Sequence, residues 1–410
     1  MSIDLRPIPV EDAVASRQLG MEAFGVRPVP PGGIDPASWP PKNMRAWGAY
    51  DDGELVGKAL VREFTSWFHG SRVPTAGMAG VTVAAERRGS GVLRPLFDAV
   101  LADAREHGEV ISTLFASSMG IYHGLGYEAI GSFHDVRIPM PTLARVSLPG
   151  GPVRARRATA ADLPEILRVY ETWAAAQNGP LTRAEEPFAL LVDDMFGPGA
   201  DYTGVTVALG PDDEVLGFAS WKRGPGDDRS NAVEVDDLVA LTPDAARVLW
   251  RTLGSFMSVV GDVQISTSGG WTGVDPARLA IPDHVATTAS THLYMLRILD
   301  VPGAVAAAHV PPVTARIPFA VVDPRTPDIE GAWTLVVADR KAHAEPDAAA
   351  LADPATDRLT FTSGGLAASY AGAMSAANLR LAGRLAGPTT HDALWDALWR
   401  GRDVHVRDNF

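Results

Sequence analysis

The feature that most constrains the fold is an internal repeat of a strand-and-helix pattern. The first copy begins with DLRPIPVEDAVASRQLGMEAFG, a short strand followed by a helix that starts with acidic residues. The second copy begins with VRARRATAADLPEILRVYETWAAA, where Thr159 and Asp162 are helix-start signals. Each copy continues into a hairpin whose turn is rich in Asp and Gly, AYDDGELVGKALVREF and VTVALGPDDEVLGFASWKRG. Such self-similarity predicts two domains of the same architecture.

A third strand, a helix and a further strand complete each copy. They are MAGVTVAAE, VLRPLFDAVLADAREHG and VISTLFA in the first copy, and AVEVDDLVALT, DAARVLWRTLGSFMSVVG and DVQISTS in the second. The order β-α-β-β-β-α-β, found twice, predicts two α/β domains with mixed sheets. Segments dense in Pro and Gly at 139–152 and 300–303 indicate the boundaries between domains.

The last part of the chain follows a different pattern. It contains four short strands before two helical patterns, namely YMLRILD, IPFAVVD, WTLVVAD and LTFTSG, then SYAGAMSAANLRLAG and HDALWDALWRG. This order predicts an α+β domain of about a hundred residues, a typical domain size. We therefore expect three domains, at residues 1–150, 151–300 and 301–410.

Composition excludes several functional classes. The net charge of the 410 residues is −13, which argues against a nucleic-acid or anionic-membrane binder, because both need a basic face. The absence of cysteine excludes disulfides, thiolate metal sites and a cysteine nucleophile. The ten histidines show no metal-ligand spacing, so we expect no metal, and no G-x-S-x-G motif indicates a hydrolase. The N-terminus has no apolar run typical of a secretory signal, which predicts a cytoplasmic protein.

The two copies differ most where the third strand leads into the next helix. The first copy has VTVAAERRGSGVLRPLF there, in which glycines alternate with Arg88 and Ser90. Glycines let backbone N–H groups approach an anion, the helix N-terminus adds a positive dipole, and Arg87, Arg88 and Arg94 add full charges. The junction therefore suits a pyrophosphate. The second copy has DLVALTPDAARVLW, without glycine and with Asp237 and Asp244, so we expect it to be structural.

The arrangement V-x-V-x-x-x-x-R-x-x-G between a strand and an amphipathic helix resembles the acetyl-CoA motif of GNAT N-acetyltransferases. The signature Arg-x-x-Gly-x-Gly/Ala reads Arg88, Gly91 and Leu93 here, with Leu in place of the last small residue. The segment FASSMGIYHGLGYEAIG is similar to the GNAT segment that carries a tyrosine on a short helix. Together with the duplication and the third domain, these motifs resemble the Eis (enhanced intracellular survival) family.

This resemblance implies an active GNAT domain, a degenerate GNAT domain and a sterol-carrier-protein-like domain. It also implies a homo-hexamer that acetylates small-molecule amines with acetyl-CoA. Tyr122 matches the general acid, and the main-chain carboxylate of Phe410 matches the base. The acetyl-CoA site would be formed by Val81, Thr82, Val83, Arg88, Gly89, Ser90, Gly91, Val92, Leu93, Arg94, Ser117 and Ser118.

Elementary chemistry is consistent with both catalytic roles. A phenol has a pKa near 10, so Tyr122 stays protonated and can neutralise the departing thiolate. An α-carboxylate has a pKa of about 3.5, so Phe410 needs burial or a relayed water to accept a proton. The backbone N–H of Val83 or its neighbour could polarise the thioester carbonyl. The alternatives are that Tyr122 packs in the core and that the tail ending in Phe410 is frayed.

The acceptor pocket is expected to include Phe24, Val26, Trp39, Leu60, Arg62 and Asn409. Eis-like enzymes acetylate polycationic aminoglycosides, which acidic pocket residues suit. Here Val26 and Asn409 stand where acids would be expected, and Arg62 adds a positive charge on the same strand face as Leu60. A less cationic or an aromatic amine is therefore as plausible as an aminoglycoside. The alternative function is a non-catalytic protein that binds CoA or an apolar ligand on a duplicated GNAT scaffold.

Overall fold

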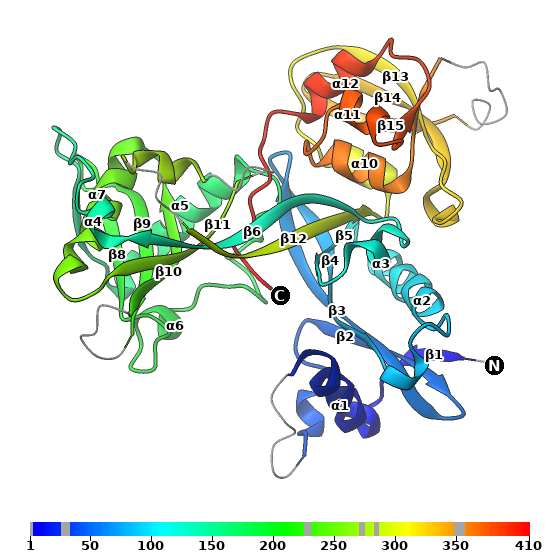
Figure 1. Cartoon of the computed structure of the whole chain (residues 1–410). Helices are drawn as coiled ribbons and strands as arrows, with labels where there is room; N and C mark the ends of the chain where they lie inside the picture. Colours follow the sequence, from blue (N-terminus) through cyan, green and yellow to red (C-terminus); the bar gives the residue numbers. More distant parts are fainter. Residues whose placement is uncertain (1–2, 26–32, 225–230, 270–274, 283–286, 348–356) are drawn as a thin grey trace.

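The protein is described by a computed structural model that covers residues 3–25, 33–224, 231–269, 275–282, 287–347 and 357–410. Among these residues the strands form two sheets, one of twelve strands and one of five. The large sheet runs through the two copies of the repeat, and the small sheet belongs to the last part of the chain, at the top of Figure 1. The predicted fold class, two α/β units followed by an α+β unit, is confirmed.

Helices cover both faces of the sheet in the first copy. Phe97 packs with Val61 on one face, and Leu19 packs with Leu55 on the other, so the first two helices lie on opposite sides of the sheet. The elements are β1 (Asp4–Pro7), α1 (Ala13–Phe24), β2 (Met44–Asp51), β3 (Glu54–Phe68), β4 (Ser71–Val83), α2 (Leu93–Glu106), β5 (Ile111–Ala116), α3 (Met119–His123), β6 (Glu128–Pro139) and α4 (Met140–Leu143).

The second copy repeats this order. The predicted helix start at Thr159 and Asp162 is confirmed as a reciprocal capping box. The elements are β7 (Arg154–Arg157), α5 (Leu163–Ala175), α6 (Val192–Phe196), β8 (Gly204–Leu209), β9 (Val215–Arg223), β10 (Ala232–Ala240), α7 (Pro243–Gly254), β11 (Asp262–Ser268) and β12 (Thr287–Ile298).

The two copies exchange strands. The order in the large sheet is β1-β2-β3-β4-β5-β12-β6-β11-β10-β9-β8-β7, so β12 lies between β5 and β6 of the first copy. In turn, β6 pairs with β11 of the second copy. The ranges 1–150 and 151–300 therefore share one sheet. The prediction that YMLRILD begins the last domain is wrong, because Tyr294 to Ile298 pair with β5 inside the large sheet.

The last part of the chain packs a five-stranded sheet, in the order β15-β14-β13-β16-β17, beside short helices. The single helix predicted over SYAGAMSAANLRLAG is wrong. One helix ends at Tyr370, Gly372 adopts a positive φ of 71°, and Ser375 caps the next. The elements are α8 (Val301–Ala306), β13 (Ala315–Val321), β14 (Gly331–Ala338), β15 (Lys341–Pro346), β16 (Leu359–Phe361), α10 (Ser363–Tyr370), α11 (Ala376–Leu381), β17 (Leu385–Ala386) and α12 (Asp392–Trp399).

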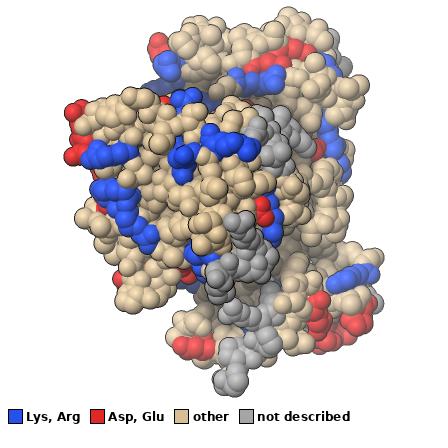
Figure 2. All heavy atoms as spheres, turned by 60° about the vertical axis from the view of Figure 1, so that its left-hand side comes forward, with Lys and Arg blue, Asp and Glu red and all other residues tan. Residues whose placement is uncertain are grey.

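Charge is dispersed on the surface over the second copy. Lys and Arg form several separate groups on this face, with neutral side chains and a few acids between them (Figure 2). The described part of this face therefore shows no continuous basic stripe of the kind that follows a nucleic-acid backbone.

Candidate active site

A split between two neighbouring strands opens the site in the first copy. Strands β4 and β5 pair in parallel only over Thr75–Gly77 and Ile111–Thr113. Just beyond, the register of β3 against β4 shifts, and Gly80 adopts a positive φ of 56° that suits glycine. Such a bulge bends a strand and increases its twist, so β4 separates from β5. The end of β4 is thereby left without a neighbour on the β5 side.

The backbone of β4 directs a donor into this split. The N–H of Ala84 donates to the carbonyl of Val56 on the β3 side, at 2.9 Å. Successive N–H groups of a strand point to opposite sides, so the N–H of Val83 points away from β3. A donor in that position can polarise a carbonyl oxygen that lies in the split.

The split forms a cavity of about 810 Å³ that extends over the start of α2. It brings together most of the residues that the sequence predicted for acetyl-CoA, and Tyr122 with them. Two predicted residues do not line it: Ser90 donates within its own turn to the carbonyl of Arg87, at 2.5 Å, and Ser118 stands at the N-cap position of α3 without a side-chain capping hydrogen bond. The lining residues are Ala23, Phe24, Val81, Thr82, Val83, Arg87, Arg88, Gly89, Gly91, Val92, Leu93, Arg94, Ser117, Ile121, Tyr122 and Leu125.

The loop before α2 has the conformation that an anion site needs. Gly89 and Gly91 have φ values of 78° and 84°, which side chains with a Cβ rarely adopt. The first helical turn follows Val92, whose side chain makes no capping hydrogen bond. The N–H groups of that turn are therefore not capped by its side chain and suit a phosphate group. Arg88 is exposed beside them, and Arg87 pairs with Asp51 at 2.5 Å.

Tyr122 lies at the wall of the cavity on α3. The residue is 8% exposed, and its ring packs edge-on against Phe97 and Tyr127, with ring centroids 6.0 and 6.1 Å away. Burial raises the pKa of Tyr122, so the phenol is protonated at neutral pH. Within the described part of the chain its hydroxyl has no hydrogen-bond partner, whereas the hydroxyl of Tyr127 lies 2.7 Å from Ser112. Tyr122 is thus available to a ligand and Tyr127 is a packing residue.

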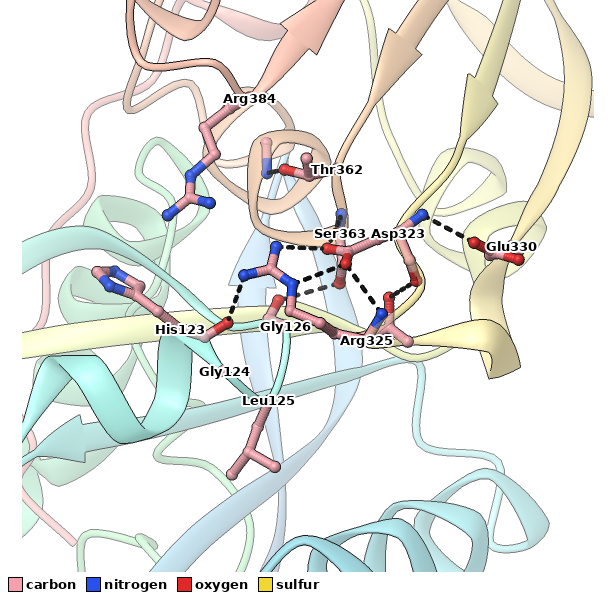
Figure 3. A network of polar contacts seen from close by, with 12 residues as sticks. His123, Gly124, Leu125, Gly126, Asp323, Arg325, Glu330, Thr362, Ser363 and Arg384 are labelled. Atoms are coloured by element: carbon pink, nitrogen blue, oxygen red, sulfur yellow. Dashed lines mark hydrogen bonds and ion pairs between the residues drawn. The ribbon is translucent and has the colours of Figure 1, made fainter.

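Two residues of the last domain help to hold the turn that follows α3, and Figure 3 draws their contacts with it. In all, four successive backbone carbonyls of this turn accept hydrogen bonds from side chains outside it, three of them from residues beyond 296. Arg325 is itself fixed by Asp323, at 2.8 Å. No sequence signal pointed to these contacts. The pairs are Arg325 with His123, Arg94 with Gly124, Arg297 with Leu125, and Ser363 with Gly126.

The C-terminal segment returns from the last domain to the centre of the large sheet (Figure 1). Asp408 pairs with buried Arg183 at 2.7 Å, and Arg183 also pairs with Asp237 of β10. The ring of Phe410 lies 4.9 Å from that of Phe64 and 5.5 Å from that of Phe115, at the base of the split.

Gly77, the last residue of β4 that pairs with β5, makes room for this ring. A Cβ at Gly77 would overlap the Phe64 ring and lie 2.8 Å from the Phe410 ring, so any larger residue there would displace one or both rings. The described structure therefore has a packed chain end instead of the frayed tail that the sequence left as an alternative.

A second cavity, of about 570 Å³, lies between α1, the segment 33–41 and the bulge at Gly80. Phe24 lines both cavities, so the two meet at this residue. Of the predicted acceptor residues, Trp39 and Leu60 line it as well. Arg62 instead lies 5.7 Å from the ring of Phe188, Asn409 is exposed, and Val26 is outside the described residues.

Sequence reasoning missed five polar residues of this second cavity: Ser16, Arg17, Asp35, Ser38 and Lys58. Lys58 precedes Leu60 by two residues on β3 and so shares its face, a relation that the period-2 pattern could have shown.

Among the described residues no group of three or more His, Asp or Glu could hold a metal ion. No described helix has both the length and the apolar character needed to cross a bilayer.

Two α/β repeats joined in one sheet, with a split β4–β5 pair and an open helix N-terminus in one of them, define a tandem GNAT acetyltransferase. Residues 4–130 and 179–300 each match a family model described as "Acetyltransferase (GNAT) domain", and residues 301–407 match "Sterol carrier protein domain". Acetyltransferases of the GNAT family use acetyl-CoA.

Similarity to known proteins shows to which family of GNAT acetyltransferases the chain belongs. An uncharacterized N-acetyltransferase of Streptomyces coelicolor is 31% identical over 330 residues, which cover 77% of this chain and 76% of that protein. N-acetyltransferase Eis of Mycobacterium tuberculosis is 31% identical over 215 residues, covering 50% of this chain and 51% of Eis. The crystal structure of a GCN5-related N-acetyltransferase from Kribbella flavida covers 100% of this chain and 98% of its own, with 30% identity and a TM-score of 0.79. The chain belongs to the Eis-like family of GNAT N-acetyltransferases.

Proposed function

We propose that this enzyme transfers the acetyl group of acetyl-CoA directly to the amine of a small molecule, with Tyr122 as general acid and the Phe410 carboxylate as base. The observation that carries the proposal is the cavity of about 810 Å³, which is lined by the glycine loop, the free end of β4 and Tyr122. An anion site, a carbonyl-polarising donor and a phenol therefore face one space.

Each group has one role in the reaction. The pyrophosphate of acetyl-CoA binds the N–H groups of the loop at Gly89–Gly91 and the start of α2, with Arg88 as counter-charge. The N–H of Val83 stabilises the negative charge that develops on the thioester oxygen. The amine nitrogen bonds to the carbonyl carbon and the C–S bond breaks. Tyr122 gives its proton to the departing sulfur, and the Phe410 carboxylate, directly or through a water, takes the proton that the amine loses.

The positions of Tyr122 and of the Phe410 ring support these roles. Tyr122 has an uncommitted hydroxyl at the cavity wall, and its raised pKa keeps the proton in place until a thiolate forms. The Phe410 ring is held at the base of the same split by Phe64 and Phe115. The acceptor amine would enter through the second cavity, which meets the first at Phe24. The hexamer, the cytoplasmic location and an aminoglycoside substrate stay predictions from the sequence.

The loop provides the sharpest test of the proposal. Gly91→Val should weaken acetyl-CoA binding by at least about tenfold, because a β-branched side chain is strained at a φ of 84° and crowds the phosphate. Gly108→Val is the matched control: Gly108 follows the other end of α2, has a φ of 79°, and likewise has open space around a Cβ. Calorimetry with CoA measures both variants. Equal affinity for the two would disprove the loop assignment.

Release of free CoA on mixing with amines tests whether the protein is a catalyst. Thiol appearance that depends on an added amine supports the transferase. Tight CoA binding without thiol release from any member of a broad amine panel would favour the non-catalytic binding protein.

A further inference from the structure

The second cavity contains a buried positive charge that no described part of the fold neutralises. The side chain of Lys58 enters it from β3, and the residue is only 5% exposed. Its ammonium lies 3.4 Å from the hydroxyl of Ser16, a long contact to a neutral group. Within the part of the chain that the structure describes, no carboxylate pairs with Lys58. A buried ammonium without a counter-charge is unfavourable, and structural lysines are seldom found in this state.

The surroundings of Lys58 are cationic on one wall. Arg17 of α1 lines the same cavity, and burial together with Arg17 lowers the pKa of Lys58 to about 8. The acid in the lining is Asp35, on the opposite segment 33–41; it is exposed, and its carboxylate accepts a hydrogen bond from the N–H of Ala37 at 2.9 Å.

The remaining walls are mostly apolar. They include Phe24, Ile34, Trp39 and Leu60, and the indole N–H of Trp39 is already used by the carbonyl of Ile8, at 3.0 Å. Lys58 and Ser16 are thus donors in this wall that a ligand can engage. A flat apolar ligand with one carboxylate would match the cavity, whereas a polycation would meet Arg17 and Lys58 as like charges.

We propose that the acceptor of this enzyme is an amine that also bears a carboxylate, and that Lys58 and Ser16 bind this carboxylate in the second cavity. The inference rests on the proposed acetyl transfer and gives its substrate class. The ligand supplies the missing counter-charge of Lys58, and its apolar body contacts Phe24 and Trp39. The amine then lies toward Phe24, where the two cavities meet.

Two matched acceptors test the proposal: 4-(aminomethyl)benzoate and 4-(aminomethyl)benzamide. Both have the same amine and ring, and they differ in charge at the far end. For the parent enzyme we expect kcat/KM for the benzoate to exceed that for the benzamide by at least about tenfold, about 1.4 kcal/mol of transition-state stabilisation. Lys58→Met should abolish this preference by lowering kcat/KM for the benzoate toward that for the benzamide. Equal rates in the parent, or a preference that survives in Lys58→Met, would overturn the proposal.

Two controls separate this proposal from others. Lys222→Met removes an exposed lysine from β9, the counterpart of β3 in the second copy, and should leave the preference unchanged. Binding of 4-methylbenzoate, measured by calorimetry with CoA present, needs no turnover. Binding that depends on Lys58 without any acetyl transfer would refute the proposed function but retain the carboxylate site. If other amines are acetylated but 4-methylbenzoate does not bind and the benzoate is not preferred to the benzamide, the carboxylate site is refuted and the proposed function is not.

Discussion

The two copies of the repeat have similar orders of elements, but they differ in whether the backbone N–H groups at the helix start after the third strand are capped. In the second copy Thr242 caps α7 by accepting a hydrogen bond from the N–H of Ala245, at 3.2 Å, whereas α2 of the first copy has no such cap. The segment Pro276–Ala280 also packs on α7, where the indole of Trp250 donates to Ala277 at 2.8 Å. The cavity left there is about 370 Å³, less than half that of the first copy.

Two buried cations show the same contrast. In the second copy Arg183 is enclosed by Asp237 and Asp408, while in the first copy no carboxylate among the described residues pairs with buried Lys58. The prediction that Asp237 stands at the strand–helix junction in place of an anion site needs correction, because it faces Arg183 inside the protein. A helix N-terminus or a buried cation can bind a ligand only while no side chain of the protein satisfies it. In the first copy the N-terminus of α2 and the ammonium of Lys58 stay available to a ligand. In the second copy side chains of the protein satisfy the N-terminus of α7 and the guanidinium of Arg183.

The largest effect is expected at Tyr122. Tyr122→Phe keeps the ring that packs on Phe97 but removes the proton, so acetyl transfer should fall about 10²–10⁴-fold. CoA affinity and the melting temperature should stay close to those of the parent. Steady-state rates at saturating acetyl-CoA measure the effect. Unchanged turnover would show that another group or water protonates the thiolate.

The free energy of unfolding should show the cost of burying the charged ammonium of Lys58. Its pKa is about 8 in the folded protein and near 10.5 when unfolded, so the unfolded chain binds this proton more tightly. The penalty is fully present below pH 8 and disappears as the pH rises to about 10.5. Lys58→Met should therefore be more stable than the parent at pH 7, by up to about 3 kcal/mol, and the gain should shrink toward pH 10. Denaturant unfolding of both proteins at several pH values measures it; a less stable variant would indicate a structural lysine.

A tag on the chain end tests the base. Adding residues after Phe410 converts its carboxylate into an amide, so acetyl transfer should fall at least about tenfold, or about 1.4 kcal/mol in barrier. CoA binding should persist because the loop at Gly89–Gly91 is untouched. The same tag at the N-terminus is the control. Equal turnover of the two proteins would remove the carboxylate from the mechanism.

The smallest effect is expected from the cap of the second copy. Thr242→Ala should cost about 1 kcal/mol of stability, the usual value of a lost N-cap, and should leave CoA affinity unchanged. Thermal unfolding and calorimetry measure the two quantities. If the variant gained a second CoA site, the cap alone would account for the loss of function in this copy.

Much of this fold could be predicted because its signals are local. The hairpins, the helix starts at Thr159 and the glycine loop each depend on residues close in sequence. The place of β12 could not be predicted, since it depends on pairing with β5, far away along the chain. The same holds for Arg325 and His123, whose contact joins two domains. The sequence pattern predicts Leu60 but not Lys58 for the acceptor pocket, although the two share a strand face, because a lone lysine on a strand is usually solvated.

The position of β12 also governs when the protein can fold during synthesis. Strand β5 lacks a neighbour on one side, and β6 lacks the same neighbour, until residues 287–298 have been made. At ordinary rates of translation this delay is on the order of ten seconds after β6 emerges. During that time the edges of β5 and β6 expose unpaired backbone groups to other nascent chains. Continuous translation through the second copy is therefore a condition for a correctly formed active site in the first.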